Sequence, residues 1–321
     1  MVRAGILGGA GYTAGELIRI LLRHPGAQLS FVQSESHAGQ PLARVHGDLL
    51  GETELHFTGT PDREADVVFL CAGHGKSRAL LERFAFAPEV RIIDLGNDFR
   101  LASPDHRFVY GLPELQRGAI RAAHRIANPG CFATAIQLAL LPLAQAGLLQ
   151  DEVHIQAVTG STGAGQQPEP TTHFSWRSHN LSVYKPFTHQ HLPEIRQSLA
   201  QLQPGFGAAL NFIPIRGDFT RGIFASLYLR CGLEEDAVRA QYAQYYAGHP
   251  FTVLSGENPH LKQVVNTNKC ILHLERHGDK LLIISILDNL LKGASGQAVQ
   301  NMNLMFGQPE DSGLWLKGAA F

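Results

Sequence analysis

Short apolar runs alternate with helical patterns over the first 130 residues. The run at residues 67–71 has no polar interruption, which is typical of a strand buried on both faces of a sheet. Strands that alternate with helices form βαβ units, so this region predicts a Rossmann-type, doubly wound parallel α/β sheet that binds ligands at the carboxyl ends of its strands. The other expected elements are strands at 3–7, 28–32 and 90–95 and helices at 13–23 and 76–84.

After residue 150 the predicted strands become longer, and their apolar positions alternate with polar ones. This pattern predicts a second, α+β domain with a mixed sheet. Its expected strands are 153–159, 209–215, 223–231, 269–275 and 281–287, its expected helices are 193–202 and 234–247, and a last helix is expected at 290–306.

One stretch, residues 126–150, contains no charged residue. A membrane span needs about 20 predominantly apolar residues, but this stretch includes Asn128, Gln137, Pro142 and Gln145. We therefore expect a buried helix here and no membrane span.

Composition and charge argue against some classes of function, such as binding to nucleic acid or to a membrane. The chain has 27 Lys and Arg against 28 Asp and Glu, a net charge of −1, which gives no electrostatic basis for binding nucleic acid or an anionic membrane. The four cysteines have no spacing typical of a zinc site or a disulfide framework, and the amino terminus lacks a signal-peptide pattern. We expect a cytoplasmic protein with free thiols.

A glycine-rich loop follows the first predicted strand and leads directly into a helix. Its spacing, G-x-x-G-x-x-A, is a variant of the dinucleotide-binding fingerprint. Glycines allow the backbone to approach a pyrophosphate, and the helix start offers N–H groups and a positive dipole end to it. The expected cofactor-binding residues are Gly8, Gly11, Tyr12, Thr13 and Ala14.

The segment after the second strand bears on the choice between NAD and NADP. Glu35 lies where an acid binds the ribose 2′-hydroxyl of NAD, whereas the hydroxyls of Ser34 and Ser36 suit a 2′-phosphate. From these residues alone both cofactors remain open.

A cysteine begins the uncharged helix. Asn128, Pro129 and Gly130 predict a turn, and Cys131 follows at the helix start. The positive end of a helix lowers a thiol pKa below about 8.5, and its N–H groups can hold an oxyanion. Cys131 is therefore a candidate nucleophile, and the alternative is a small buried residue that opens a core helix.

A nucleophilic cysteine needs an acid/base partner. His189 and His191 precede Pro193, which suits the first turn of a helix, and Glu194 lies three residues after His191, close enough to orient its ring. We expect acid/base chemistry from this group. A surface histidine cluster and a pair of metal ligands are the alternatives.

Two arginines are candidates for binding anionic substrate groups. Arg100 follows the strand at 90–95, and Arg221 lies in a turn between two strands of the second domain. Residues 160–165 form a glycine-rich loop that could close on a ligand. Together with the cysteine and the dinucleotide loop, these features predict hydride reduction of an acyl group through a cysteine thioester.

These motifs resemble those of the N-acetyl-γ-glutamyl-phosphate reductases of arginine biosynthesis, in the wider aspartate-semialdehyde dehydrogenase group. The resemblance covers nearly the whole chain. It rests on the residues at 8–15, 94–100, 128–134, 160–165, 189–195, 221–222 and 288–294.

The resemblance implies NADPH-dependent reduction of N-acetyl-γ-glutamyl phosphate to N-acetyl-glutamate semialdehyde and phosphate. It implies Cys131 as the nucleophile and His191 as the acid/base, with His189 touching the substrate. It also implies Arg100 on the phosphate, Arg221 on the substrate carboxylate and Asn289 near the nicotinamide.

The resemblance further implies that the last helix packs on the first domain. We therefore expect a dinucleotide-binding domain of residues 1–131 with about 290–321, and a substrate-binding and oligomerisation domain of residues 132–289. Apolar sheet faces in the second domain favour a homo-oligomer, either a dimer or a tetramer.

The sequence departs from the family at the substrate side. Phe132 and Ala133 replace a common Tyr-Pro, Gln166 replaces a common arginine, and the chain looks short. Other acyl phosphates (N-succinyl-glutamyl, aminoadipyl or aspartyl) therefore remain alternatives. So do a non-catalytic nucleotide-binding regulator and a cysteine hydrolase without a cofactor.

Overall fold

A computed structural model describes residues 1–319, and in it the chain divides into two units. The first contains Met1–Pro129 and Ala294–Trp315, and the second contains Gly130–Gly293 and the chain from Leu316. The segment from Leu316 groups with the second unit because Ala319 N donates to Val265 O and Asn266 Nδ2 donates to Lys317 O. Residues 320–321 of the range expected for the first domain lie outside the described residues.

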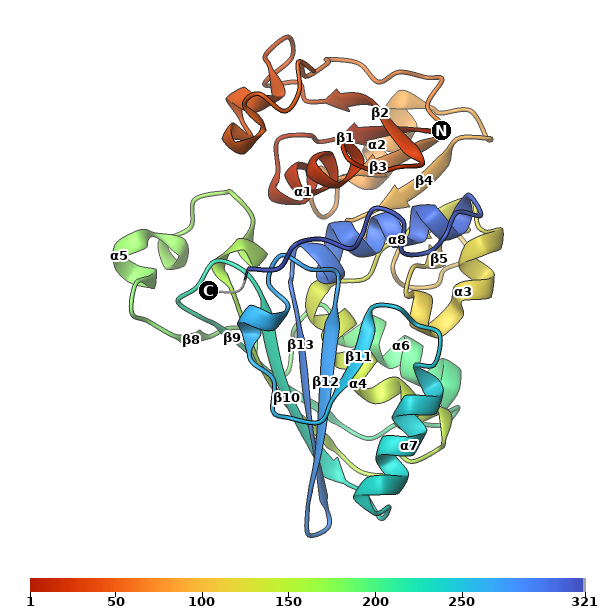
Figure 1. Ribbon diagram of the computed structural model, residues 1–321, viewed down its shortest axis with the longest axis vertical. Helices are drawn as coiled ribbons and strands as arrows, with labels where there is room; N and C mark the ends of the chain where they lie inside the picture. Colours follow the sequence, from red (N-terminus) through yellow and green to blue (C-terminus); the bar gives the residue numbers. More distant parts are fainter. Residues whose placement is uncertain (320–321) are drawn as a thin grey trace. The chain divides into compact units, whose positions relative to one another are not determined.

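The first unit is built on a parallel sheet with the strand order β2-β1-β3-β4-β6-β5. This confirms the predicted Rossmann-type fold. Figure 1 shows α3 and α8 next to each other, and α8 also packs against α1 and β4. The elements are β1 (Val2–Leu7), α1 (Tyr12–Leu21), β2 (Ala27–Gln33), 3₁₀ turns at Leu42–Arg44 and Gly47–Leu49, β3 (Val67–Leu70), α2 (Ser77–Phe84), β4 (Arg91–Asp94), β5 (Val109–Tyr110), α3 (Pro113–Ala122), β6 (Arg125–Ala127) and α8 (Gly296–Met305).

The first sheet is apolar because helices and loops cover both of its faces. All four residues of β3 are buried, as the uninterrupted apolar run predicted. The strands are parallel, so their carboxyl ends lie at one edge of the sheet. The glycine loop after β1, the loop after β3 and the segment after β4 are therefore brought together at that edge.

The second unit is built on a mixed sheet with the order β11-β12-β13-β10-β7-β9-β8, as predicted. Figure 1 shows α4, α6 and α7 packed together beside it. The elements are α4 (Cys131–Gln145), β7 (Val153–Thr159), 3₁₀ turns at Ser161–Ala164 and Pro170–Thr172, α5 (Phe174–Arg177), β8 (Ser182–Val183), α6 (Leu192–Leu202), β9 (Leu210–Arg216), β10 (Ile223–Arg230), α7 (Glu235–Tyr245), β11 (Thr252–Ser255), a 3₁₀ turn at Leu261–Gln263, β12 (Cys270–His277) and β13 (Lys280–Leu287).

The uncharged stretch forms the 15-residue helix α4, which is buried against β10 and β13. Its backbone accepts hydrogen bonds from neighbouring side chains, with Ser285 Oγ donating to Ala135 O at 2.8 Å and Tyr242 Oη donating to Ala139 O at 2.5 Å. Among the described helices, none combines the length and the apolar character that a membrane crossing requires.

The predicted last helix is wrong in its first turn. Leu291–Ser295 forms a π-helical turn, and α8 begins only at Gly296. The buried carboxylate of Asp288 accepts from Leu290 N at 2.8 Å and Leu291 N at 3.3 Å, which fixes the chain before α8. Single π turns of this kind are frequent at functional sites.

Candidate active site

The glycine loop after β1 has the geometry of a pyrophosphate cradle. Gly8 has φ +80°, and a Cβ there would lie 2.7 Å from the backbone of Ala72, so only glycine fits this position. Gly11 caps α1 with no side-chain hydrogen bond, and no acidic residue occupies the first turn of that helix. Thr13 O accepts from Ser295 Oγ at 2.8 Å. The start of α1 is thus arranged to receive an anion.

Two further polar groups, Asp94 and Cys71, lie at the carboxyl ends of β4 and β3, the strands next to this loop. Asp94, at the end of β4, accepts from Ser77 Oγ at 2.6 Å and from Gly96 N at 2.8 Å. Burial raises the pKa of Asp94 to about 6. Burial also raises the pKa of Cys71 to about 12, which leaves that thiol unreactive.

Arg100 is buried, and its guanidinium contacts the backbone of the turn before Cys131. Its Nε donates to Asn128 O at 3.0 Å, and its Nη2 donates to Leu95 O at 3.2 Å. Arg100 therefore ties the segment after β4 to the residue three positions before Cys131. Its expected contact with a substrate phosphate stays a prediction.

Cys131 is the first residue of α4, with Gly130 as the N-cap. Gly130 N donates to Glu194 Oε2 at 3.1 Å, and Gly130 O accepts from Thr134 N at 2.8 Å. Gly293 approaches closely, since a Cβ there would lie 2.8 Å from Cys131 Cβ. The sulfur-bearing residue is thus held by the buried carboxylate on one side and by the π turn on the other.

The two candidate histidines lie beside this turn. The His191 ring packs on Gly130, because a Cβ on Gly130 would lie 2.3 Å from His191 Nε2. His191 Nε2 is 3.9 Å from Glu194 Oε1, and His191 N donates to His189 Nδ1 at 3.2 Å. Burial, and next the charge of Lys185, lower the pKa of His189 to about 4.

Phe132, one of the departures from the family pattern, contacts both histidine rings. Its ring centroid lies 5.5 Å from that of His189, 6.3 Å from that of His191 and 5.2 Å from that of Phe212. The aromatic side chain therefore fixes both imidazoles. Gln166, the other departure, is exposed.

Tyr184 is a site residue that the sequence reasoning missed. It is in ring contact with His189 at 5.8 Å, and the Arg216 guanidinium carbon lies 4.7 Å from its ring centroid. Burial, and next the nearby Cys131 sulfur, raise the pKa of Tyr184. The two-residue strand β8 that precedes it is too short for a periodic signal, and only the Tyr-Lys-Pro turn before the histidines marks the position.

Arg221 and Asn289 join the loops at one end of the second sheet. Arg221 Nε donates to Asp288 Oδ2 at 3.0 Å. Asn289 Oδ1 accepts from Gly222 N at 2.6 Å, and Asn289 Nδ2 donates to Thr162 Oγ1 at 3.0 Å. Asn289 thereby connects the predicted 160–165 loop to the Arg221 turn.

The alternative of a metal site has no geometric support. Across residues 1–319, no group of three or more His, Cys, Asp and Glu side chains is arranged to hold a metal ion.

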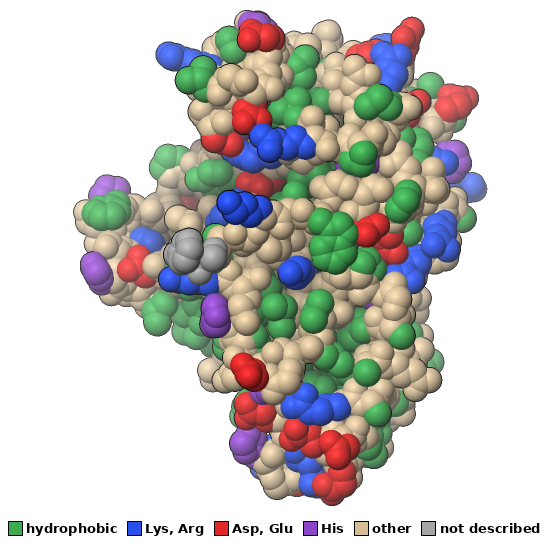
Figure 2. Space-filling view, in the orientation of Figure 1, with side chains coloured by type: hydrophobic (Ala, Val, Ile, Leu, Met, Phe, Trp, Pro, Cys, Tyr) green, Lys and Arg blue, Asp and Glu red, His purple; other side chains and the backbone are tan. Residues whose placement is uncertain are grey.

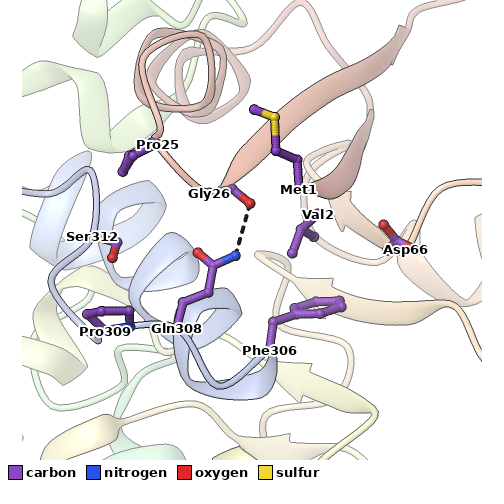
Figure 3. Close-up of a pocket in the computed structure, with 9 residues that line it drawn as sticks. All are labelled: Met1, Val2, Pro25, Gly26, Asp66, Phe306, Gln308, Pro309 and Ser312. Carbon is purple, nitrogen blue, oxygen red and sulfur yellow. Dashed lines mark hydrogen bonds between the residues drawn. The ribbon is translucent and has the colours of Figure 1, made fainter.

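The first unit also has a surface hollow of about 690 Å³, and no residue of the glycine loop is among those that line it; Figure 3 draws the lining residues. It is lined by Val2 at the start of β1 and by Asp66 just before β3, with Gln308 Nε2 donating to Gly26 O at 2.9 Å. These are the amino ends of parallel strands, whereas cofactors bind at the carboxyl ends. The hollow is therefore not the dinucleotide site.

Two family models match the chain. One, the NAD binding domain of semialdehyde dehydrogenases, covers residues 3–123, and the other, the semialdehyde dehydrogenase dimerisation domain, covers residues 131–289. The first of these matches the unit with the glycine loop, and the second matches the unit with Cys131 and the histidines.

Relatives named N-acetyl-gamma-glutamyl-phosphate reductase align with the whole chain. The one from Parabacteroides distasonis is 56% identical and the one from Christiangramia forsetii is 57% identical, and each alignment covers 100% of both chains. The chain is therefore as long as these relatives.

Solved structures share the fold at low identity. Aspartate semialdehyde dehydrogenase from Francisella tularensis has a TM-score of 0.72 and 14% identity, covering 95% of this chain and 100% of that one. The Candida albicans enzyme, solved with NADP, has a TM-score of 0.72 and 12% identity, covering 95% and 99%. From the full-length relatives and both domain matches, the chain belongs to the N-acetyl-γ-glutamyl-phosphate reductase family of semialdehyde dehydrogenases.

Proposed function

We propose that this chain reduces N-acetyl-γ-glutamyl phosphate to N-acetyl-glutamate semialdehyde and inorganic phosphate, with NADPH as the reductant, in arginine biosynthesis. One observation carries the proposal: Cys131 occupies the first position of α4, and the His191 imidazole packs on the adjacent Gly130. A thiol beside an imidazole at a helix start suits covalent acyl transfer. The substrate comes from the names of the relatives.

The proposed reaction begins when the Cys131 sulfur bonds to the γ-acyl carbon and the bond from that carbon to the phosphate oxygen breaks. Phosphate leaves with the electron pair of that bond, and Cys131 becomes a thioester. When bound, NADPH supplies the hydride that reduces the thioester carbon. The carbon–sulfur bond of the resulting hemithioacetal then breaks, which releases the aldehyde. The N-terminal turn of α4 points backbone N–H groups at the oxygen that becomes negative in these steps.

We assign the acid/base role to His191. It accepts the thiol proton in the first step and returns it to the departing sulfur in the last. His189 is poorly suited to this role, because its Nδ1 already accepts a hydrogen bond and burial lowers its pKa to about 4. Glu194 holds Gly130 N and lies 3.9 Å from the His191 ring, where a carboxylate stabilises an imidazolium. Glu194 is thus a positioning residue.

The residues of the first unit fit a dinucleotide. The strict glycine requirement at Gly8 and the start of α1 at Tyr12 suit the pyrophosphate. The hydroxyls of Ser34 and Ser36 suit a 2′-phosphate, which favours NADP over NAD. We also place the enzyme in the cytoplasm, where the four cysteines, none of which forms a disulfide, stay reduced.

The test is a comparison of substrates in both directions. NADPH oxidation is followed with N-acetyl-γ-glutamyl phosphate, and phosphate-dependent NADP reduction is followed with N-acetyl-glutamate, N-succinyl-glutamate, aminoadipate and aspartate semialdehydes. We expect kcat/KM for the N-acetyl compound to exceed the others by about tenfold or more. A preference for another semialdehyde would reassign the substrate. If none of these compounds is turned over, the proposed reductase activity is refuted.

We further propose that two copies associate through the open face of the second sheet. One face packs on α4, as the Ser285 bond to Ala135 O requires. The other face carries partly exposed apolar side chains, among them Phe224, Leu282 and Tyr228, and Figure 2 shows apolar side chains over these strands. The match to a dimerisation domain supports this assignment. In sedimentation velocity, Leu282→Glu is expected to dissociate the oligomer, whereas Arg121→Glu, exposed on α3, is not.

A further inference from the structure

The chain leaves β2 directly beside the glycine loop. Gln33, the last residue of β2, accepts hydrogen bonds at its carbonyl from Gly8 N at 3.1 Å and from Gly9 N at 2.8 Å. The next residues therefore begin within one peptide unit of the expected pyrophosphate cradle. In this fold the adenosine ribose of a dinucleotide extends in that direction from the pyrophosphate.

Two hydroxyls and an imidazole form a polar cluster in this segment. His37 Nδ1 lies 2.8 Å from Ser36 Oγ and 3.2 Å from Ser34 Oγ, and the hydroxyls are 3.4 Å apart. The His37 ring is held in turn against Phe57, with the ring centroids 5.7 Å apart. The cluster presents hydrogen-bond donors, but none of these side chains is a permanent cation.

The permanent cation comes from α2. Arg83, in the last turn of that helix, forms an ion pair with Glu35, which stands between the two serines. The Arg83 guanidinium carbon also lies 5.0 Å from the centroid of the ring of Phe84, the next residue of the same helix. Both side chains are more than half exposed, at 57% for Arg83 and 59% for Glu35, so a ligand can reach them.

The ion pair with Arg83 changes the role expected for Glu35 in cofactor binding. An acid that reads the ribose 2′-hydroxyl of NAD must offer its oxygens to that hydroxyl, but here an oxygen of Glu35 is bound to Arg83. A 2′-phosphate carries a charge of about −2 and would place it next to this carboxylate. Arg83 is the group that can compensate this charge. A guanidinium also binds phosphate with two parallel N–H donors, which a serine hydroxyl cannot do.

We infer that Arg83 binds the 2′-phosphate of NADP directly and is the residue that selects NADP over NAD, with Glu35 as its counter-ion before the cofactor binds. Ser34 and Ser36, aligned by His37, donate the remaining hydrogen bonds. The inference rests on the proposed function, because it takes its ligand from the cofactor of that reaction.

The test uses adenosine fragments, so that it does not depend on reductase activity. Binding of 2′,5′-ADP and of 5′-AMP to the full chain is measured by calorimetry, and NADPH and NADH are titrated by fluorescence. For Arg83→Gln we expect the affinity for 2′,5′-ADP and NADPH to fall about tenfold or more, as the loss of a charged hydrogen bond implies, while 5′-AMP and NADH change less than about twofold. For Glu35→Gln we expect 2′,5′-ADP to bind severalfold more tightly.

A matched control and a double variant make the result decisive. Arg23 also forms a surface ion pair in this unit, with Glu52 at 2.5 Å, so Arg23→Gln removes the same charge away from the cluster and should leave all four affinities unchanged. In the Glu35→Gln background, Arg83→Gln should still weaken 2′,5′-ADP binding, because the contact is direct. If that loss disappears in the double variant, or if 5′-AMP weakens as much as 2′,5′-ADP, the inference is overturned. Absence of reductase turnover with intact discrimination would refute the proposed function and leave this assignment standing.

Discussion

Replacing Gly130 by alanine tests the packing of His191 on the cysteine turn. The backbone at Gly130, with φ −71° and ψ 153°, accepts any residue, so the change acts through the added Cβ alone. That Cβ would lie 2.3 Å from His191 Nε2, whereas ordinary van der Waals contact begins at 3.4 Å. The imidazole must therefore move by about 1.1 Å, the difference between these distances.

A displacement of this size at a reacting group costs about 10²-fold in rate. We therefore expect Gly130→Ala to lower kcat for reduction by about two orders of magnitude. The affinity for NADPH should stay unchanged, because the glycine loop belongs to the other unit. The thermal midpoint should fall by only a few degrees, since overpacking costs about 1–3 kcal/mol.

Steady-state kinetics, NADPH titration and calorimetry on the same preparation separate these effects. Gly118→Ala is the control, because a Cβ at Gly118 on α3 meets nothing within 4 Å. Should Gly130→Ala keep kcat within twofold of the wild type, His191 would not act at the position assigned to it.

Three further changes have defined outcomes. Gly8→Ala should weaken NADPH binding more than tenfold in a fluorescence titration, because its Cβ meets the Ala72 backbone at 2.7 Å and its φ is +80°; unchanged affinity would remove Gly8 from the cradle. His191→Asn should lower kcat by a larger factor than it raises KM. A rise in KM larger than the loss in kcat would make His191 a substrate-binding residue and not an acid/base. The pKa of His189 is about 4 in the folded protein and about 6.5 in the unfolded chain. As the pH is lowered between these values, the unfolded state takes up a proton that the folded state does not bind, and the free energy of unfolding decreases. Urea denaturation measures the free energy of unfolding at pH 7 and at pH 5. Between these two values the free energy of unfolding of His189→Gln should decrease by about 2 kcal/mol less than that of the wild type, and an equal decrease would contradict the burial of a neutral His189.

Most of the strands and helices could be predicted from the sequence, because a run of apolar residues indicates a buried element. The runs at 3–7, 28–32 and 67–71 became β1, β2 and β3 nearly residue for residue, and the strand 153–159 is unchanged as β7. The elements that were missed are short or polar. β5 and β8 have two residues each, and α3 packs on α8 with few apolar positions of its own.

The site was predictable where motif and local geometry coincide. Cys131 stands at a helix start and His191 stands before Pro193, and both positions follow from turn and helix signals in the chain. The partners of the charged groups were not predictable, because they come from segments far away in sequence. Arg100 bonds to Asn128 O, Arg221 to Asp288 and Glu35 to Arg83.

The central claim, that Cys131 carries the acyl group, can be tested by trapping the intermediate. The enzyme is mixed with N-acetyl-γ-glutamyl phosphate without NADPH, quenched in acid and digested, and the peptides are examined by mass spectrometry. We predict an N-acetylglutamyl adduct on the peptide that contains Cys131, which disappears when NADPH is added and is absent in Cys131→Ser. Full reductase activity in Cys131→Ser, or an adduct at another residue, would contradict the account.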